Sequence, residues 1–488
     1  MKKYHIGLDF GTYQSKVCVY DIENDTHEFF QFENGTFFIP SRVCLTRNDK
    51  FLYGDKPSDY KEEYTYFKIA SAEDEEFHSE TFGTGNPILN FYKFNEFNNY
   101  SPEFLSVIYL TNLLFIVKGK YKKTSSKNEN TGGLLGRLFQ SNTAKQKTKF
   151  TVQLGIPTEW SHEKNIRRKR KFENILILAE LLQKEYSTHE IFLSKSANQL
   201  KSDVHDLYTS HNFTNKNDYQ TYLNNLGLSV YSETAAGLTF IVKSGQLLPG
   251  YYAILDIGGG SSDVSFFSVI NDQKIRYLAS ESYMIAANNV YSKTIVKTDS
   301  VEKLGQAEIK VRKQIEDGKW KGTNLETQLK YVNQNINSVL YKLFNKRVYF
   351  FDRDMIKKFK DQPVILYGGG SKLPIINSGK IKIHDNGVRA NRNGRVTEEI
   401  IKKWTFMEKQ KIERYSSIIN ILPSTNTWKN ELPLLVVALG LSFIHSPGDT
   451  DWFSDEYYKP KDGTGDRLVP HPFNEGYFIY DVLNSKWK

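Results

Sequence analysis

The feature that most constrains this chain is a glycine turn that directly follows an acidic strand end. In its first copy, the apolar residues 6–8 lead into Asp9, Gly11 and Thr12 make a tight turn, and a second apolar stretch follows. Apolar alternation on both sides of a short glycine turn predicts a β-hairpin. Gly11 lets the backbone approach an anion closely, so the amides of Thr12 and Tyr13 are predicted to form an anion-binding nest.

A second segment repeats this design. Residues 252–255 read as a buried strand that ends at Asp256, residues 258–262 form a glycine-serine turn, and Asp263 starts the return strand. Either hairpin alone is equally well explained as an ordinary glycine turn. Two hairpins that each place an aspartate just before the glycines predict one shared design.

A third glycine turn occupies residues 364–374. Residues 364–367 are an apolar strand, residues 368–371 are Gly-Gly-Gly-Ser, and a helix is expected to begin near Pro374. Glycines leave the backbone bare, which suits the stacking of a flat base or a ribose against the turn.

The order of these segments resembles the phosphate-1, phosphate-2 and adenosine motifs of the actin, sugar kinase and heat-shock ATPase superfamily. Within it, the nucleotide-binding domain of DnaK-type (seventy-kilodalton heat-shock) chaperones is the most similar. Further stretches that carry the resemblance are residues 38–43, 53–55, 67–69, 154–157, 232–238 and 435–442. The resemblance is spread over about residues 4–445.

The chain also departs from that family's pattern. Glu233 is followed by Thr234 rather than by the usual proline, and Ser261-Ser262 stands in place of a threonine-led pair. Residues 74–150 and 185–225 have no resemblance to the family, so these are the regions where a member would acquire partners of its own.

The resemblance implies an α/β protein with an actin-like ATPase fold. Two lobes, each with a ribonuclease H-like mixed sheet flanked by helices, would enclose a nucleotide cleft. Lobe I is expected over 1–248, with an elaborated insertion subdomain at about 41–149. Lobe II, with the adenosine motif, is expected over 249–430, and a returning helix with an aromatic C-terminal tail over 431–488.

The resemblance further implies that ATP or ADP binds with Mg²⁺. Asp9 and Asp256 would hold the metal through its waters, since Mg²⁺ keeps several waters and favours carboxylates. The residues expected in catalysis are Lys68, Glu233, Asp256 and Asp263. The residues expected to bind nucleotide are Gly11, Thr12, Tyr13, Gly258, Gly259, Gly260, Ser261, Ser262, Gly368, Gly369, Gly370 and Ser371.

Each of these residues also has a simpler interpretation. An aspartate beside a glycine turn often only caps the turn. Glu233 lies at an expected helix start, where a carboxylate is favoured by the helix dipole. Lys68 lies among aromatic residues, where a lysine often packs its stem along the surface.

Three functions remain open at this stage. The first is a slow ATPase that acts as a DnaK-like molecular switch with a partner or client protein and that is expected to lack the peptide-binding sandwich domain of those chaperones. The second is an actin-like (MreB/ParM-type) filament-forming ATPase, the only case in which an oligomer is expected. The third is a small-molecule kinase of the sugar-kinase branch.

Composition limits the classes of partner and the cellular compartment that are expected for this chain. The net charge of +9 is concentrated at 118–149 and 167–171. A solvated insertion and a charged helix face explain both better than nucleic-acid binding does. Cys18 and Cys44 are the only cysteines and the ten histidines have no metal-ligand spacing, so neither a disulfide framework nor a zinc site is predicted.

The start of the chain passes straight into the first strand, so no signal peptide is expected, and the predicted location is the cytoplasm. The most apolar run, 104–117, contains Ser106, Thr111 and Asn112. Because it is short and interrupted, it is interpreted as a buried amphipathic helix rather than a membrane span.

Overall fold

The structure is a computed structural model. It describes residues 2–33, 35–54, 57–72, 99–127, 148–158, 166–211, 216–243, 249–269, 275–283, 286–292, 310–343, 364–374, 380–384, 399–405, 428–443 and 453–454. Large parts of the expected insertion, 73–98 and 128–147, lie outside the described residues. Of the expected aromatic tail, only 453–454 lie within them.

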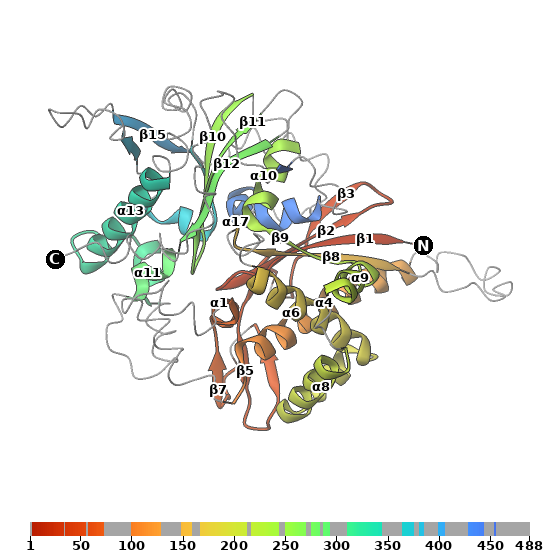
Figure 1. The fold of residues 1–488 in the computed structure, drawn as a ribbon. Helices are drawn as coiled ribbons and strands as arrows, with labels where there is room; N and C mark the ends of the chain where they lie inside the picture. Colours follow the sequence, from red (N-terminus) through yellow and green to blue (C-terminus); the bar gives the residue numbers. More distant parts are fainter. Residues whose placement is uncertain are drawn as a thin grey trace.

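The described strands form mixed and antiparallel sheets flanked by helices, which confirms the predicted α/β class (Figure 1). The first sheet contains both strands of the first predicted hairpin. Its strands, in spatial order, are β3 (Thr26–Phe29), β2 (Gln14–Asp21), β1 (Lys3–Asp9), β8 (Lys149–Ile156) and β9 (Leu228–Ser232), and β4 (Ile39–Pro40) pairs with β2.

The second sheet contains the second predicted hairpin and the strand of the third glycine segment. Its strands, in spatial order, are β14 (Lys380–His384), β15 (Glu399–Thr405), β13 (Val364–Tyr367), β10 (Gly250–Ile257), β11 (Ser262–Val269), β12 (Ile275–Tyr283) and β16 (Phe453–Ser454). Register pairs Asp256 with Asp263 across the hairpin, as it pairs Asp9 with Lys16 in the first sheet.

Five strands of each sheet share one order and one set of directions. In the first sheet, β3, β2 and β1 are antiparallel neighbours, while β8 and then β9 run parallel to β1. In the second sheet, β12, β11 and β10 are antiparallel neighbours, while β13 and then β15 run parallel to β10. The chain therefore builds the same strand arrangement twice, each time around an acidic glycine hairpin.

Helices cover the sheets, and a small antiparallel sheet adjoins them. The small sheet contains β6 (Phe51–Tyr53), β5 (Val43–Leu45) and β7 (Glu62–Tyr64). The helices are α1 (Phe67–Ala72), α4 (Pro102–Lys127), α6 (Ile166–Glu185), α7 (His189–Ser194), α8 (Ala197–Ser210), α9 (Lys216–Leu226), α10 (Glu233–Lys243), α11 (Ala287–Ser292), α13 (Asn324–Leu343) and α17 (Trp428–Ser442), with a 3₁₀ turn η4 (Gly369–Lys372).

Hydroxyl side chains cap several of the helices. Ser101 accepts a hydrogen bond from the Phe104 amide at 3.2 Å, and Pro102 is the first residue of α4. Ser196 caps α8 by accepting from the Gln199 amide. Such caps satisfy amides that have no partner within the helix, and proline is favoured at the first helical position because its missing N–H is not needed there.

Helix α4 confirms the helix expected over the apolar run, but it is not amphipathic there. Residues 104–115 are all buried, because α4 packs against α1, α6, α7 and α8. Its polar side chains find partners inside the protein: Thr111, for example, donates to the Val107 carbonyl. Pro102–Lys122 is long and apolar enough to cross a membrane, yet 78% of its most apolar stretch is buried within the structure. Burial in the protein accounts for its apolar composition.

Helices α10 and α17 lie between the two sheets (Figure 1). Helix α17 contacts β1, β2 and β8 of the first sheet and β13 of the second. A β-carbon added to Gly440 would lie 1.7 Å from the Ala236 carbonyl oxygen, so the two helices cross with their backbones in contact. This close crossing holds the first residue of α10, Glu233, at a fixed place between the hairpins.

Candidate functional site

The two hairpin turns converge on one region. A β-carbon added to Gly260 of the second turn would lie 2.0 Å from Ile69 Cδ1 and 3.1 Å from Thr12 Oγ1 of the first turn. The second turn therefore lies directly against the first turn and against α1, which carries Lys68. Thr12 and Gly260, which are 248 positions apart in the sequence, meet here because each turn projects from the end of its own sheet.

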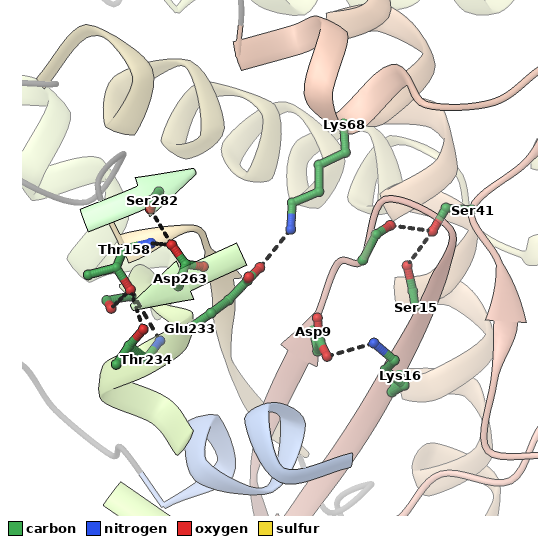
Figure 2. Close-up of polar contacts among 12 residues, drawn as sticks. Asp9, Ser15, Lys16, Ser41, Lys68, Thr158, Glu233, Thr234, Asp263 and Ser282 are labelled. Atoms are coloured by element: carbon green, nitrogen blue, oxygen red, sulfur yellow. Dashed lines mark hydrogen bonds and ion pairs between the residues drawn. The ribbon is translucent and has the colours of Figure 1, made fainter. Parts of the chain in front are cut away.

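Three acidic side chains gather beside these turns. Glu233, Asp256 and Asp263 are all buried, and each offers a carboxylate oxygen within 4.8 Å of the others. Figure 2 shows Glu233 and Asp263 approaching from different elements, the start of α10 and the start of β11. The sequence predicted all three as candidates, and the structure brings them together.

Lys68 neutralises part of this cluster. Its Nζ lies 2.6 Å from Glu233 Oε1, and the two side chains are 4% and 10% exposed. Figure 2 shows Lys68 extending from α1 towards Glu233. Burial raises the pKa of the Glu233 carboxyl, and the neighbouring Lys68 ammonium opposes that rise. Lys68 is thus buried in the site, contrary to its simpler interpretation as a surface lysine.

Asp9 lies at the end of β1 and pairs with a cation that the sequence analysis missed. Lys16 Nζ donates to Asp9 Oδ2 at 2.9 Å, and both side chains are largely buried. The hairpin register places the two residues opposite each other. A signal was present in the sequence, because Lys16 is the one charged residue within the otherwise apolar and hydroxyl-bearing stretch 15–20 of the return strand.

Ionisation of the acidic residues of the second hairpin is disfavoured by burial and by neighbouring negative charge. Burial raises the pKa of Asp256 well above its ordinary value, and the charges of Glu233 and Asp263 raise it further. Burial and the Glu233 charge raise the pKa of Asp263 to about 7. Among the described residues, no hydrogen-bond donor or cation contacts the Asp256 side chain, which is 7% exposed. Burial disfavours an ionised carboxylate, so carboxylates of this kind are stabilised by protonation or by a bound cation.

This carboxylate set fits a hard divalent cation such as Mg²⁺. Only oxygen atoms are offered, and oxygen ligands are the ones that Mg²⁺ and Ca²⁺ prefer. Asp256 and the acid cluster would supply the negative charge. Asp9, the other residue expected at the metal, already has Lys16 as a partner. The two aspartates predicted for the metal are therefore in different electrostatic surroundings.

The third glycine segment packs against the end of β10, at Asp256 and Ile257. Gly368 has φ +83°, a conformation in which a side chain is strained, and a β-carbon there would lie 2.1 Å from Asp256 Oδ1. Gly369 is exposed while Gly370 is buried. The Ser371 hydroxyl is also buried and donates to the Gly368 carbonyl at 2.5 Å. Ser371 thus closes the turn, and Gly369 is the most exposed of the three glycines 368–370.

The first turn is held by serines on both of its sides. Ser41 Oγ donates to the Gly11 carbonyl at 2.6 Å, and Ser15 Oγ lies 3.0 Å from Ser41 Oγ. The Ser41 amide also donates to the Tyr13 carbonyl at 2.9 Å. Because these bonds fix the carbonyls of the turn, its amides keep a defined direction. In the second turn, the Gly258 amide donates to the Ser261 carbonyl at 2.9 Å.

A second cation that the sequence analysis missed lies over the first turn. The guanidinium carbon of Arg312 is 3.6 Å from the centre of the Tyr13 ring. Arg312 belongs to a helical stretch over residues 310–316. Stacking of arginine on an aromatic face is favourable and directional. Nothing in the sequence around Arg312 pairs it with Tyr13, which lies about 300 positions earlier.

No protein-family model matches this sequence, and a search of curated proteins found no match.

Proposed function

We propose that this chain is an ATP-binding and slowly ATP-hydrolysing molecular switch of the DnaK type, with an actin-like fold of two lobes around a nucleotide. The repeated strand order supports the fold, since each sheet carries a hairpin, a third antiparallel strand and two parallel strands. The observation that carries the proposal is the contact of the two acidic hairpin turns at Gly260 and Thr12. Turns from two separate sheets then face one ligand.

In this proposal the turn amides hold the phosphates of ATP. Backbone N–H groups in a glycine turn form a nest for oxygens that carry negative charge. Gly11, Thr12 and Tyr13 would serve from the first hairpin. Residues 259–262 would serve from the second, because the Gly258 amide already donates to the Ser261 carbonyl. Ser261 would donate its hydroxyl to the γ-phosphate. Glycines 368–370 would lie against the base or the ribose.

Two lysines would balance the charge of the phosphates. Lys68 reaches the acid cluster from α1, and Lys16 reaches Asp9 from β2. Positive charge close to the transferred phosphoryl group stabilises the transition state, and phosphoryl transfer depends mainly on such positioning and electrostatics. Asp9 and Asp256 would hold Mg²⁺ through its waters. The bound metal would neutralise charge on the phosphates.

In the proposed reaction, the oxygen of a water molecule attacks the γ-phosphorus of ATP. The bond from that phosphorus to the β-phosphate oxygen breaks, and ADP, phosphate and one proton are released. Glu233, Asp256 and Asp263 would accept a hydrogen bond from the water and take up its proton.

Titration calorimetry with ATP, ADP and GTP in the presence of Mg²⁺ tests the binding step, and phosphate release tests hydrolysis. The proposal expects adenine nucleotides to bind and phosphate to appear slowly. Absence of binding to folded protein would refute it. The filament alternative expects ATP-dependent sedimentation, and the kinase alternative expects transfer to a sugar from a panel. A cytoplasmic location and a protein partner or client belong to the same proposal.

A further inference from the structure

Asp263 is held differently from the other acidic residues of the site. Its Oδ1 atom accepts hydrogen bonds from the Thr158 amide at 3.2 Å and from the Ser282 hydroxyl. Its Oδ2 atom receives no hydrogen bond from the described part of the chain. Both donors therefore act on one oxygen, and the other oxygen is left as an acceptor (Figure 2).

The two donors reach Asp263 from separate elements. Ser282 lies on β12, directly opposite Asp263 in the antiparallel register with β11. Thr158 lies two residues after β8, in the first sheet. Side chains that face each other across antiparallel strands are close enough to bond. Asp263 is thus held from its own sheet by a hydroxyl and from the other sheet by an amide.

Thr158 also connects Asp263 to the helix that begins with Glu233. Its Oγ1 lies 2.6 Å from Thr234 Oγ1 and 2.8 Å from Ser232 Oγ. Because Ser232 and Thr234 flank Glu233, the network sets Asp263 and Glu233 relative to each other. A chain of bonds of this kind restricts both carboxylates to one arrangement.

We propose that Ser282 is a positioning residue for Asp263. Together with the Thr158 amide, its hydroxyl fixes Oδ1, so that Oδ2 is presented to the attacking water. This inference rests on the proposed ATP hydrolysis. Ser282 does not contact the reacting atoms in this scheme; it acts only through Asp263.

The test uses Ser282→Ala in the full chain. Ser282→Ala removes one of two donors, while the Thr158 amide remains, so kcat for ATP hydrolysis is expected to fall about tenfold, the loss typical of one hydrogen bond to a charged acceptor. KM for ATP and the affinity for ADP are expected to stay unchanged in this variant. Ser282→Thr restores the hydroxyl and is expected to recover most of the rate.

Ser280→Ala is the matched control. Ser280 lies two residues earlier on β12, and its hydroxyl bonds the Ser265 hydroxyl at 2.6 Å in the next cross-strand pair on the same face of the sheet. The Ser280→Ala substitution removes an equivalent cross-strand hydrogen bond between hydroxyl groups, and this bond involves no carboxylate. Ser280→Ala is expected to keep the parent kcat, so a rate loss common to both variants would mean that β12 had merely been loosened and would overturn the proposal.

A double-mutant cycle with Asp263→Asn completes the test. If Ser282 acts only through Asp263, Ser282→Ala has no further effect on kcat in the Asp263→Asn protein. Equal losses in both backgrounds would overturn the inference, as would a parent rate for Ser282→Ala. Failure of the unmodified protein to hydrolyse ATP would overturn the proposed function and this inference with it, whereas the other two outcomes would leave the proposed function standing.

Discussion

Lys68 Nζ lies 2.6 Å from Glu233 Oε1, and both side chains are buried. The ion pair links the short helix α1 to the first residue of α10. A buried pair of this kind holds two elements in place, and removal of one partner leaves an uncompensated charge, which costs about 3–5 kcal/mol. The same contact therefore has a structural role and a proposed catalytic one, and the two can be separated by experiment.

Lys68→Ala is expected to lower both stability and turnover. The unpaired Glu233 carboxylate destabilises the protein, and the lost positive charge lowers kcat by about a hundredfold or more. Adding Glu233→Gln removes the buried charge, so the double variant regains stability but not activity. Chemical denaturation and phosphate release measure the two effects. Parent turnover in Lys68→Ala would contradict the catalytic assignment.

Asp263→Asn is expected to stabilise the protein without nucleotide or metal. Asparagine keeps an oxygen for the Ser282 and Thr158 donors and removes a charge that faces Glu233 and Asp256. The folded pKa of Asp263 is raised to about 7, so its contribution to stability is complete below the unfolded pKa and is lost as pH rises through about 7.

The gain from Asp263→Asn therefore grows from pH 5 to pH 8, and at pH 8 it should reach a few degrees in melting temperature, about 1–2 kcal/mol. Thermal unfolding in EDTA at the two pH values measures it. An equal gain at both pH values would show that charge is not the cause. Turnover should fall strongly in the same variant.

Magnesium alone is expected to stabilise the unmodified protein, because a cation that binds only the folded state shifts the unfolding equilibrium. Asp256→Asn should remove most of this gain, since the Asp256 side chain is buried and has no donor or cation among the described residues. Asp206→Asn, on the exposed face of α8, is the control. A magnesium effect that survives in Asp256→Asn would place the cation elsewhere.

Arg312→Ala is expected to speed the release of ADP severalfold. The guanidinium lies 3.6 Å from the centre of the Tyr13 ring and joins the 310–316 stretch to the first turn. Loss of the contact, worth about 0.5–2 kcal/mol, makes it easier for these elements to separate. Stopped-flow release of a fluorescent ADP analogue measures the rate. Lys313→Ala, the next residue and exposed, should release ADP at the parent rate.

Local patterns in the sequence were enough to predict the elements of the site. Alternation around Gly11 and around Gly258 predicted both hairpins, and the apolar run 104–117 predicted the helix α4. These signals are local because strand pairing across a short turn and the side-chain period of a helix depend on residues only a few positions apart. The candidate acids Asp9, Asp256 and Asp263 followed from the same patterns.

Tertiary structure alone decided which of these elements meet. The partner of Lys68 is 165 positions away, and the Thr158 amide reaches Asp263 across 105 positions. Arg312 and Ser282 stood out in no local pattern. Such contacts depend on how α10 and α17 pack between two sheets, and backbone contact at Gly440 sets that packing. Side-chain period and turn chemistry specify a strand or a helix, whereas the neighbours of a buried charge depend on the packing of the whole chain.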